Sequence, residues 1–379
     1  MLARGEVPGE RAVRRVGGPG GPDGRPSGAR GGVGAESGAR MPIVIIQKLT
    51  STDGFIAFDL DDAPAAGVTR SAPKILVDGA SLLARSLTYR FASFERQVGG
   101  ASAGVNAAPA DRAAALTAYV AEIEPLVRDG RFLTEAARGV SPDDLAPVRA
   151  IDPRPQDYWD RHDELTGFGV AVAADAAVGG LAGRAVAVEG FDAGGPALAA
   201  AVVERGGTVI AVSTAEGTAF HPVGFDPVVL AAAWAEHGPA LVTVLDPEPA
   251  QAAAIFGAEV DVLVAGSKPG VIDDQVAAGL RAAVVVPSAA VPVTAKALAV
   301  LRRAGTVVVP DFVSTAGPLF LGWPSPGASD PRVDADAAIA ASFAEVAGHA
   351  DGPLLGACLR AEAFLATWRP TLPFGRPLA

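Results

Sequence analysis

Short apolar runs and longer helical patterns alternate along the second half of the chain. The apolar runs are rich in Val and lie at residues 185–188, 209–212, 260–264, 283–286 and 306–309. Unbroken apolar strands of this length, separated by Ala-rich helical stretches, are typical of a parallel sheet whose two faces are both covered by helices. The pattern therefore predicts an α/β fold with a doubly wound parallel sheet over residues 161–332.

Residues 41–160 show a more mixed pattern, which predicts a separate α/β domain. A short strand is expected at residues 42–46, a turn at 59–64 and a helix at 80–94. A second helix over residues 113–127 keeps an apolar stripe at 3.6-residue spacing, and Asp111 favours its N-terminal end. The Pro-containing segment 152–155 breaks regular structure and separates the two domains.

Two further helical segments flank the predicted parallel sheet. One helix is expected at residues 166–177, just before the first apolar run, and a helical pattern returns over residues 333–368. The sequence leaves open whether this last segment packs on the first domain and completes it or lies across a subunit interface.

The first 40 residues differ in composition from the rest of the chain. They contain 12 Gly, 4 Pro and 7 Arg and almost no aliphatic run. Such a segment cannot offset the entropy cost of becoming ordered, so we expect a disordered tail over residues 1–40. Met41 opens the first patterned segment and is a candidate for the true start of translation.

Composition and charge exclude several classes of protein. The 42 acidic and 31 basic residues give a net charge of -11, which would repel a nucleic-acid backbone. A single cysteine and four scattered histidines offer no metal-ligand spacing, so we expect no metal. We find no apolar stretch of about 18 to 20 residues without polar breaks, and therefore expect a cytoplasmic protein with no membrane span.

A glycine-containing turn follows the first apolar run. Gly190 and Gly195 stand where a dinucleotide-binding turn needs glycines, and Asp192 stands between them where such a turn has another glycine. A carboxylate there adds a negative charge where a pyrophosphate would lie, so Asp192 is expected to mimic a phosphate. Thr214, after the second run, replaces the acid that would bind a ribose hydroxyl. The motif fits either a cofactor site or an ordinary strand-to-helix turn.

The order of several short motifs resembles that of the glutamate, leucine, phenylalanine and valine dehydrogenase family. The motifs are 64–70 (PAAGVTR), 87–90 (LTYR), 99–105 (GGASAGV), 166–170 (TGFGV), 183–188 (GRAVAV), 209–213 (VIAVS) and 309–312 (VPDF). The resemblance covers most of residues 54–323 and is nearer to the leucine and phenylalanine enzymes than to the long glutamate enzymes. It implies a substrate-binding and dimerisation domain over residues 41–160, completed by 333–379, and a Rossmann-like NAD(P)-binding domain over 161–332.

The resemblance also implies a reaction, the reversible NAD(P)-dependent oxidative deamination of an L-amino acid to a 2-oxo acid by a homo-oligomer. The family's first lysine binds the substrate carboxylate, and Arg90 stands at its position. At the catalytic lysine and aspartate this chain has Ser102 and Ala137, which supply no acid or base near neutral pH. The residues that would contact NAD or NADP are Gly190, Asp192, Gly195, Thr214 and Thr166.

These replacements predict a chain that has lost the family's dehydrogenase activity. Two alternatives remain, namely an active NAD(P)-dependent oxidoreductase with a rebuilt site and an interaction or sensor protein with an empty cleft. Taken alone, Ser102 is interpreted as a serine of a Gly-Ala-rich turn and Arg90 as a solvated or ion-paired surface arginine. His162 and His221 are interpreted as surface histidines, and no spacing places Glu135 in a cleft.

Overall fold

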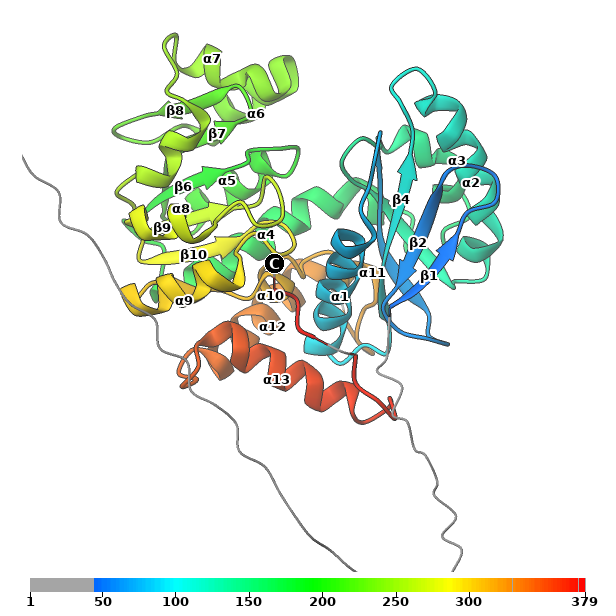
Figure 1. Ribbon diagram of the computed structural model, residues 1–379. Coiled ribbons are helices and arrows are strands. Elements are labelled where there is room, and N and C mark those ends of the chain that lie inside the picture. The colour runs from blue at the N-terminus through cyan, green and yellow to red at the C-terminus, as the bar shows by residue number, and fades with distance from the viewer. Residues whose placement is uncertain (1–43, 329, 374, 379) are drawn as a thin grey trace, which may run out of the picture. The chain divides into compact units, whose positions relative to one another are not determined.

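Two β-sheets organise the computed structural model, which describes residues 44–328, 330–373 and 375–378 (Figure 1). The predicted tail over residues 1–40 lies outside the described residues. Both sheets contain parallel strands with helices packed against them, so the predicted α/β fold class is confirmed. One sheet is built from strands before residue 137, and the other from strands between residues 185 and 308.

The first sheet has five strands in the order β1-β2-β4-β3-β5. β3, β4 and β5 are parallel to one another, while β2 is antiparallel to both β1 and β4. Two helices, α1 (Val77–Ser93) and α2 (Arg112–Arg128), lie close to their predicted ranges and connect the parallel strands. The strands span Ile45–Lys48 (β1), Gly54–Phe58 (β2), Ala65–Ala72 (β3), Gly99–Asn106 (β4) and Phe132–Ala136 (β5).

The helices α1 and α2 lie on opposite faces of this sheet. A Cβ added to Gly100 of β4 would lie 1.8 Å from the carbonyl oxygen of Ala84 in α1, so glycine is required where helix and strand approach. On the other face, the Tyr119 hydroxyl of α2 lies 2.5 Å from the Thr69 hydroxyl of β3. The interpretation of Ser102 as a turn residue is wrong, because β4 is a buried central strand whose small residues let α1 pack closely.

The second sheet has six strands in the order β11-β10-β9-β6-β7-β8. All neighbouring strands are parallel except β7 and β8, and the strand order reverses between β6 and β9, as in a doubly wound sheet. All five predicted apolar runs form strands, and β8 is an edge strand that the pattern does not predict. The strands span Ala185–Glu189 (β6), Thr208–Thr214 (β7), Gly217–Phe220 (β8), Val262–Ala265 (β9), Val284–Pro287 (β10) and Val307–Val308 (β11).

The remaining helices follow β5; α3 contacts α2 in the first domain, α13 contacts α1, and most of the others pack around the second sheet. They span Ala146–Arg149 (α3), Tyr158–Val178 (α4), Gly195–Glu204 (α5), Pro227–His237 (α6), Leu241–Leu245 (α7), Asp274–Gly279 (α8), Ala295–Ala304 (α9), Asp311–Ser314 (α10), Leu319–Gly322 (α11), Pro331–Val346 (α12) and Pro353–Leu365 (α13). Short 3₁₀ turns occur at Asp143–Leu145, Gly238–Ala240 and Ala252–Gly257.

The long helix α4 begins at Tyr158, eight residues before its predicted start at residue 166. Gly167 and Gly169 lie within it, and their low helix propensity weakens the helical pattern at this end. Gly167 is needed for packing, because a Cβ there would lie 2.5 Å from the backbone nitrogen of Leu198 in α5. The helix therefore starts among residues that contact the first sheet and ends packed against the second domain.

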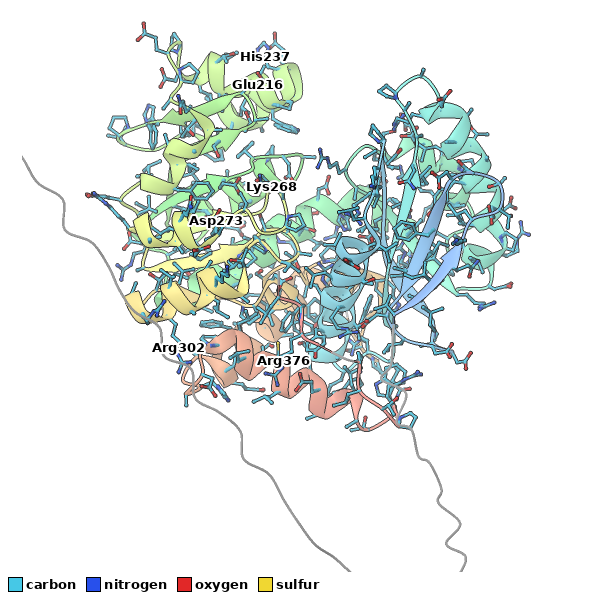
Figure 2. All side chains as sticks on the ribbon, in the orientation of Figure 1. Glu216, His237, Lys268, Asp273, Arg302 and Arg376 are labelled. Atoms are coloured by element: carbon cyan, nitrogen blue, oxygen red, sulfur yellow. The ribbon has the colours of Figure 1, made fainter. Side chains whose placement is uncertain are left out.

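The C-terminal segment packs on α1 of the first domain, within the same chain. α13 contacts α1, and the Tyr89 hydroxyl donates a hydrogen bond of 2.9 Å to Glu362 of α13. Beyond α13, Arg376 pairs with Glu362 at 2.7 Å (Figure 2). In α1, Arg85 Nη1 donates to the carbonyl oxygen of Gly375 at 2.6 Å. The last residues thus connect α13 to α1.

One helical stretch, Pro227–Leu245, is long and apolar enough to cross a membrane by length and composition alone. It consists of α6, a 3₁₀ turn and α7. The stretch contains the polar residues Glu236 and His237, so it is not one of the unbroken apolar stretches that the sequence analysis excludes. Such a single stretch is weak evidence of a membrane span, because core helices pass the same test.

Candidate ligand site

Arg90 lies in the last turn of α1 and connects the first domain to the second. Its Nη2 donates a hydrogen bond of 2.7 Å to the hydroxyl of Thr315, which directly follows α10. Burial lowers the pKa of Arg90, and the nearby carboxylates of Glu135 and Asp311 oppose that shift. Its Nε is buried without a hydrogen-bond partner among the described residues. Arg90 is therefore an interdomain contact residue, not a solvated surface arginine.

A second hydrogen-bonded contact joins the same two helices. Asp311, the first residue of α10, accepts a hydrogen bond of 2.6 Å from the Ser86 hydroxyl of α1. The same carboxyl oxygen accepts one of 2.9 Å from the backbone N–H of Val291. Burial raises the pKa of this carboxyl. Together with the bond between Arg90 and Thr315, this contact holds α1 against α10.

A small pocket lies beside Arg90, and residues from both halves of the chain line it. The lining includes Glu135 of β5, Tyr158 at the start of α4 and Trp323 after α11. The cavity volume is about 10 Å³, which is roughly the minimum that holds one water molecule. In this conformation the pocket has no room for an amino acid.

Glu135 brings a carboxylate to this pocket. Its Oε2 lies 3.0 Å from His162 Nε2, and its Oε1 accepts hydrogen bonds from Arg154 Nη1 at 3.0 Å and from the Tyr158 hydroxyl. His162 Nδ1 lies 3.0 Å from Asp163. The interpretation of His162 as a surface histidine is wrong, because its side chain is only 26% exposed and is paired with Glu135.

The charges of this cluster fix its protonation state. Burial opposes ionisation of both partners, yet their mutual attraction raises the pKa of His162 to about 9 and lowers the pKa of Glu135 well below its usual range. Both groups are therefore ionised at neutral pH. A carboxylate with so low a pKa is a poor proton acceptor, so the cluster serves better to hold structure than to catalyse.

Glu135 is a site residue that the sequence analysis did not place, and the strand register shows where it lies. Glu135 pairs with Val68 of β3, and Val68 pairs with Ser102 of β4, so the three side chains lie in one row on the same face. A single acidic residue near the carboxyl end of the otherwise mostly apolar strand β5 is the signal that could have revealed Glu135.

His221, which the sequence analysis interprets as a surface histidine, is half-buried, and its ring lies 5.2 Å from that of Phe225.

Ser102 and Ala137 are the residues that the resemblance matches to the family's lysine and aspartate. The Ser102 hydroxyl is fully buried and accepts a long hydrogen bond of 3.4 Å from Arg70 Nη2. Ala137 follows β5, where its N–H donates to the Thr69 carbonyl oxygen at 3.0 Å, and its methyl group carries no proton to exchange. Neither position therefore supplies a general acid or base.

The predicted glycine turn joins β6 to α5. Gly190 has a φ of +77°, and a Cβ there would lie 2.6 Å from the backbone nitrogen of Ser267. A Cβ on Gly195 would lie 2.8 Å from the Phe191 ring. Between these glycines, Asp192 Oδ1 accepts a hydrogen bond of 2.9 Å from the N–H of Gly194. An N–H that a pyrophosphate would use at the start of α5 is thus already bonded to a carboxylate.

A second carboxylate lies where the strand order of the second sheet reverses. Glu189, the last residue of β6, is buried and accepts hydrogen bonds of 3.0 and 3.2 Å from the N–H groups of Gly266 and Ser267, just after β9. Ligands of doubly wound sheets bind at this crevice. Glu189 therefore places a negative charge directly before the turn that would hold the pyrophosphate.

The remaining predicted cofactor residues also use their hydroxyls within the protein. Thr214 donates a hydrogen bond of 2.7 Å to the Pro239 carbonyl oxygen and accepts one from the N–H of Glu216. Thr166 donates to the carbonyl oxygen of His162 at 2.9 Å. At this edge, Asp192 and Glu189 accept hydrogen bonds from the backbone N–H groups of Gly194, Gly266 and Ser267. Within the described ranges, no group of three or more His, Cys, Asp or Glu side chains is arranged to hold a metal ion.

A mixed sheet followed by a doubly wound sheet with a glycine turn agrees with the two-domain fold that the resemblance implies. Residues 160–321 match the family model described as Glutamate/Leucine/Phenylalanine/Valine dehydrogenase. The match over these residues supports the family assignment that the motifs predict.

Characterised relatives support the same assignment over a larger part of the chain. Glutamate dehydrogenase A2 of Halobacterium salinarum is 28% identical over 298 residues, which are 70% of this chain and 70% of that protein. Glutamate dehydrogenase of Thermotoga maritima is 29% identical over 287 residues, 67% of each chain. The NADP(+)-dependent glutamate dehydrogenase of Pyrobaculum calidifontis is 31% identical over 180 residues, 45% of this chain and 43% of that one.

Solved structures share the fold at low sequence identity. The hetero-hexameric glutamate dehydrogenase of Thermus thermophilus, in a Leu-bound form, has a TM-score of 0.69 at 21% identity and covers 87% of this chain and 90% of its own. The L-tryptophan dehydrogenase of Nostoc punctiforme has a TM-score of 0.58 at 21% identity, with coverages of 86% and 96%.

Proposed function

We propose that this chain is a non-catalytic member of the amino acid dehydrogenase family, which acts by assembling with a catalytic relative. The observation that carries the proposal is the pair Ser102 and Ala137. Oxidative deamination needs proton transfer at the reacting carbon and nitrogen, and general acid-base steps each contribute about 10² to 10⁴ in rate. Neither a buried serine hydroxyl nor a methyl group supplies this transfer.

The pocket beside Arg90 and the predicted cofactor turn also support the proposal that the chain is non-catalytic. The pocket beside Arg90 has a volume of about 10 Å³, so no amino acid enters without a movement of the residues that line it. In the second domain, Asp192 and Glu189 occupy the backbone donors near the predicted cofactor turn. We therefore propose that NAD and NADP bind weakly or not at all, although the family uses them.

Assembly is the part of the proposal that gives such a chain a role. The Thermus thermophilus relative is described as hetero-hexameric, which shows that this fold is compatible with mixed assemblies. A chain with an intact scaffold and no acid-base groups is suited to be a structural or regulatory subunit. We propose a cytoplasmic oligomer for this chain, and the nearer likeness to the leucine branch stays a prediction.

The first test is turnover. The purified chain, with NAD⁺ or NADP⁺ and a panel of L-amino acids, is expected to give no deamination, while an intact family enzyme serves as the positive control. Calorimetric titration of NADH and NADPH is expected to show no saturable heat below millimolar concentration. Micromolar cofactor binding together with turnover would contradict the proposal.

The second test is assembly. The chain is co-expressed with a catalytic family member from the same genome, and the mixture is analysed by native mass spectrometry after affinity purification through this chain only. Mixed hexamers or dimers are the expected result. Exclusive self-association would contradict the regulatory-subunit role, while leaving the loss of catalysis intact.

One observation favours a second candidate function, an active oxidoreductase with a rebuilt site. Arg90 and Glu135 line the same pocket and supply a cation and an anion that suit the two charged ends of an amino acid. Under that reading Glu135→Gln would abolish a measurable turnover and leave the oligomeric state unchanged. The low pKa of Glu135 and the small pocket volume favour the non-catalytic proposal.

A further inference from the structure

Two arginines without acidic partners lie together at the carboxyl ends of the parallel strands in the first sheet. Arg70 is near the end of β3, and Arg138 follows the neighbouring strand β5. The two strands continue side by side at this point, because the N–H of Ser71 donates a hydrogen bond of 2.9 Å to the Arg138 carbonyl oxygen. The carboxyl ends of parallel strands are where α/β sheets bind ligands.

Within the part of the chain that the structure describes, neither side chain has an acidic partner. Among the described residues, no carboxylate forms an ion pair with Arg70 or Arg138, although the chain has 42 acidic residues and 31 basic ones. The Arg70 Nε is buried without a hydrogen-bond partner, and its Nη2 reaches Ser102 at 3.4 Å. Two other arginines near this sheet do have acidic partners, since Arg112 pairs with Asp144 and Arg154 pairs with Glu135.

The electrostatics of Arg70 agree with this geometry. Burial lowers its pKa, and the positive charge of Arg138 lowers it further. A partly buried guanidinium next to a second one is unfavourable unless an anion compensates both charges. Arg138 is exposed and Arg70 is half-buried, so an anion can reach the pair from solvent.

We propose that Arg70 and Arg138 form a binding site for a small dianion, either a phosphate group or a dicarboxylate, with the Ser102 hydroxyl holding the Arg70 side chain in position. The planar guanidinium groups suit such oxyanions, because each can donate two parallel hydrogen bonds. The position matched to the family's catalytic lysine thereby contacts an anion-binding arginine. This inference goes beyond the proposed function and does not depend on the loss of catalysis.

The experiment is a calorimetric titration of the full chain with inorganic phosphate and, separately, with succinate, at constant ionic strength and without cofactor. Four variants are compared, namely Arg70→Gln, Arg70→Lys, Arg138→Gln and Arg303→Gln. Arg303 is an exposed arginine of α9 with no ion pair among the residues described, so it is the control for a lost surface charge. Circular dichroism and thermal unfolding check that each variant is folded.

We expect saturable binding of at least one anion, and its affinity should fall at least about tenfold in Arg70→Gln and in Arg138→Gln, as the loss of a charged hydrogen bond predicts. Arg303→Gln should bind like the unmodified chain. Binding of phosphate alone identifies a phosphate site, and binding of succinate alone identifies a dicarboxylate site. The absence of binding by either anion, or equal affinity in all variants, would overturn the proposal. Arg70→Lys, which keeps the charge without the fork of donors, should bind with intermediate affinity.

Discussion

Glu135 and Arg70 lie on neighbouring strands of one sheet, on the same face, in opposite electrostatic surroundings. Glu135 is matched by His162 and Arg154 and receives a hydrogen bond from Tyr158. Arg70 has a serine hydroxyl at 3.4 Å and a second arginine nearby. Glu135, whose oppositely charged partners all come from the chain itself, stabilises the folded state. Arg70 has no such partner among the described residues, so it stabilises the folded state little and is available to bind a ligand.

The largest change in the free energy of unfolding is expected when the carboxylate of Glu135 is removed. Glu135→Gln leaves the His162 and Arg154 charges without one of their partners, and breaking a buried ion pair costs about 3–5 kcal/mol. Urea unfolding followed by circular dichroism measures the loss. Glu124→Gln is the matched control, because Glu124 belongs to an exposed pair with Arg128, and it should change stability by less than about 0.5 kcal/mol. Equal effects of the two variants would remove the contrast between the regions.

The next effect is a dependence of stability on pH. The pKa of His162 is about 9 in the folded chain and about 6.5 in an unfolded one. Its contribution to the free energy of unfolding is therefore complete below about pH 6.5 and is lost as the pH rises through about 9, a change of about 3 kcal/mol.

Chemical unfolding at intervals between pH 6 and pH 10 measures this loss. The same series on His162→Gln isolates the histidine, because that variant should lose little stability across the window. A variant that follows the same curve as the unmodified chain would show that another group is responsible.

The smallest change in the free energy of unfolding is expected when the guanidinium group of Arg70 is removed. Arg70→Gln breaks no ion pair among the described residues and relieves the repulsion by Arg138, so stability should change by less than about 0.5 kcal/mol or increase. The urea midpoint, at an unchanged slope, reports the change. A loss of unfolding free energy above about 2 kcal/mol would indicate that Arg70 stabilises the fold as Glu135 does, and the contrast between the two residues would fail.

The sequence predicts the second sheet better than the first. Strands buried on both faces are continuous apolar runs, and residues 185–188 or 283–286 therefore stand out. β4 contains Gly100 because α1 packs directly on its backbone, and that close contact gives the strand the composition of a turn. Local composition cannot distinguish a glycine-rich turn from a glycine-rich strand on which a helix packs closely.

The candidate site is predicted in part. The resemblance brings Arg90 and Ser102 to attention, and both lie on the face of the first sheet that contacts α1 or in α1 itself. Glu135 and His162 are 27 positions apart and meet only because α4 begins beside β5. The link from Arg90 to Thr315 joins residues separated by 225 positions, and no periodic pattern encodes such a contact.

The contact of the last residues with α1 has a consequence for the order of synthesis. α1 leaves the ribosome well before α13, Gly375 and Arg376, which follow it much later in the chain. Until they emerge, the face of α1 that α13 covers stays open to solvent or to a chaperone. The first domain therefore completes its packing only after the whole second domain has been synthesised.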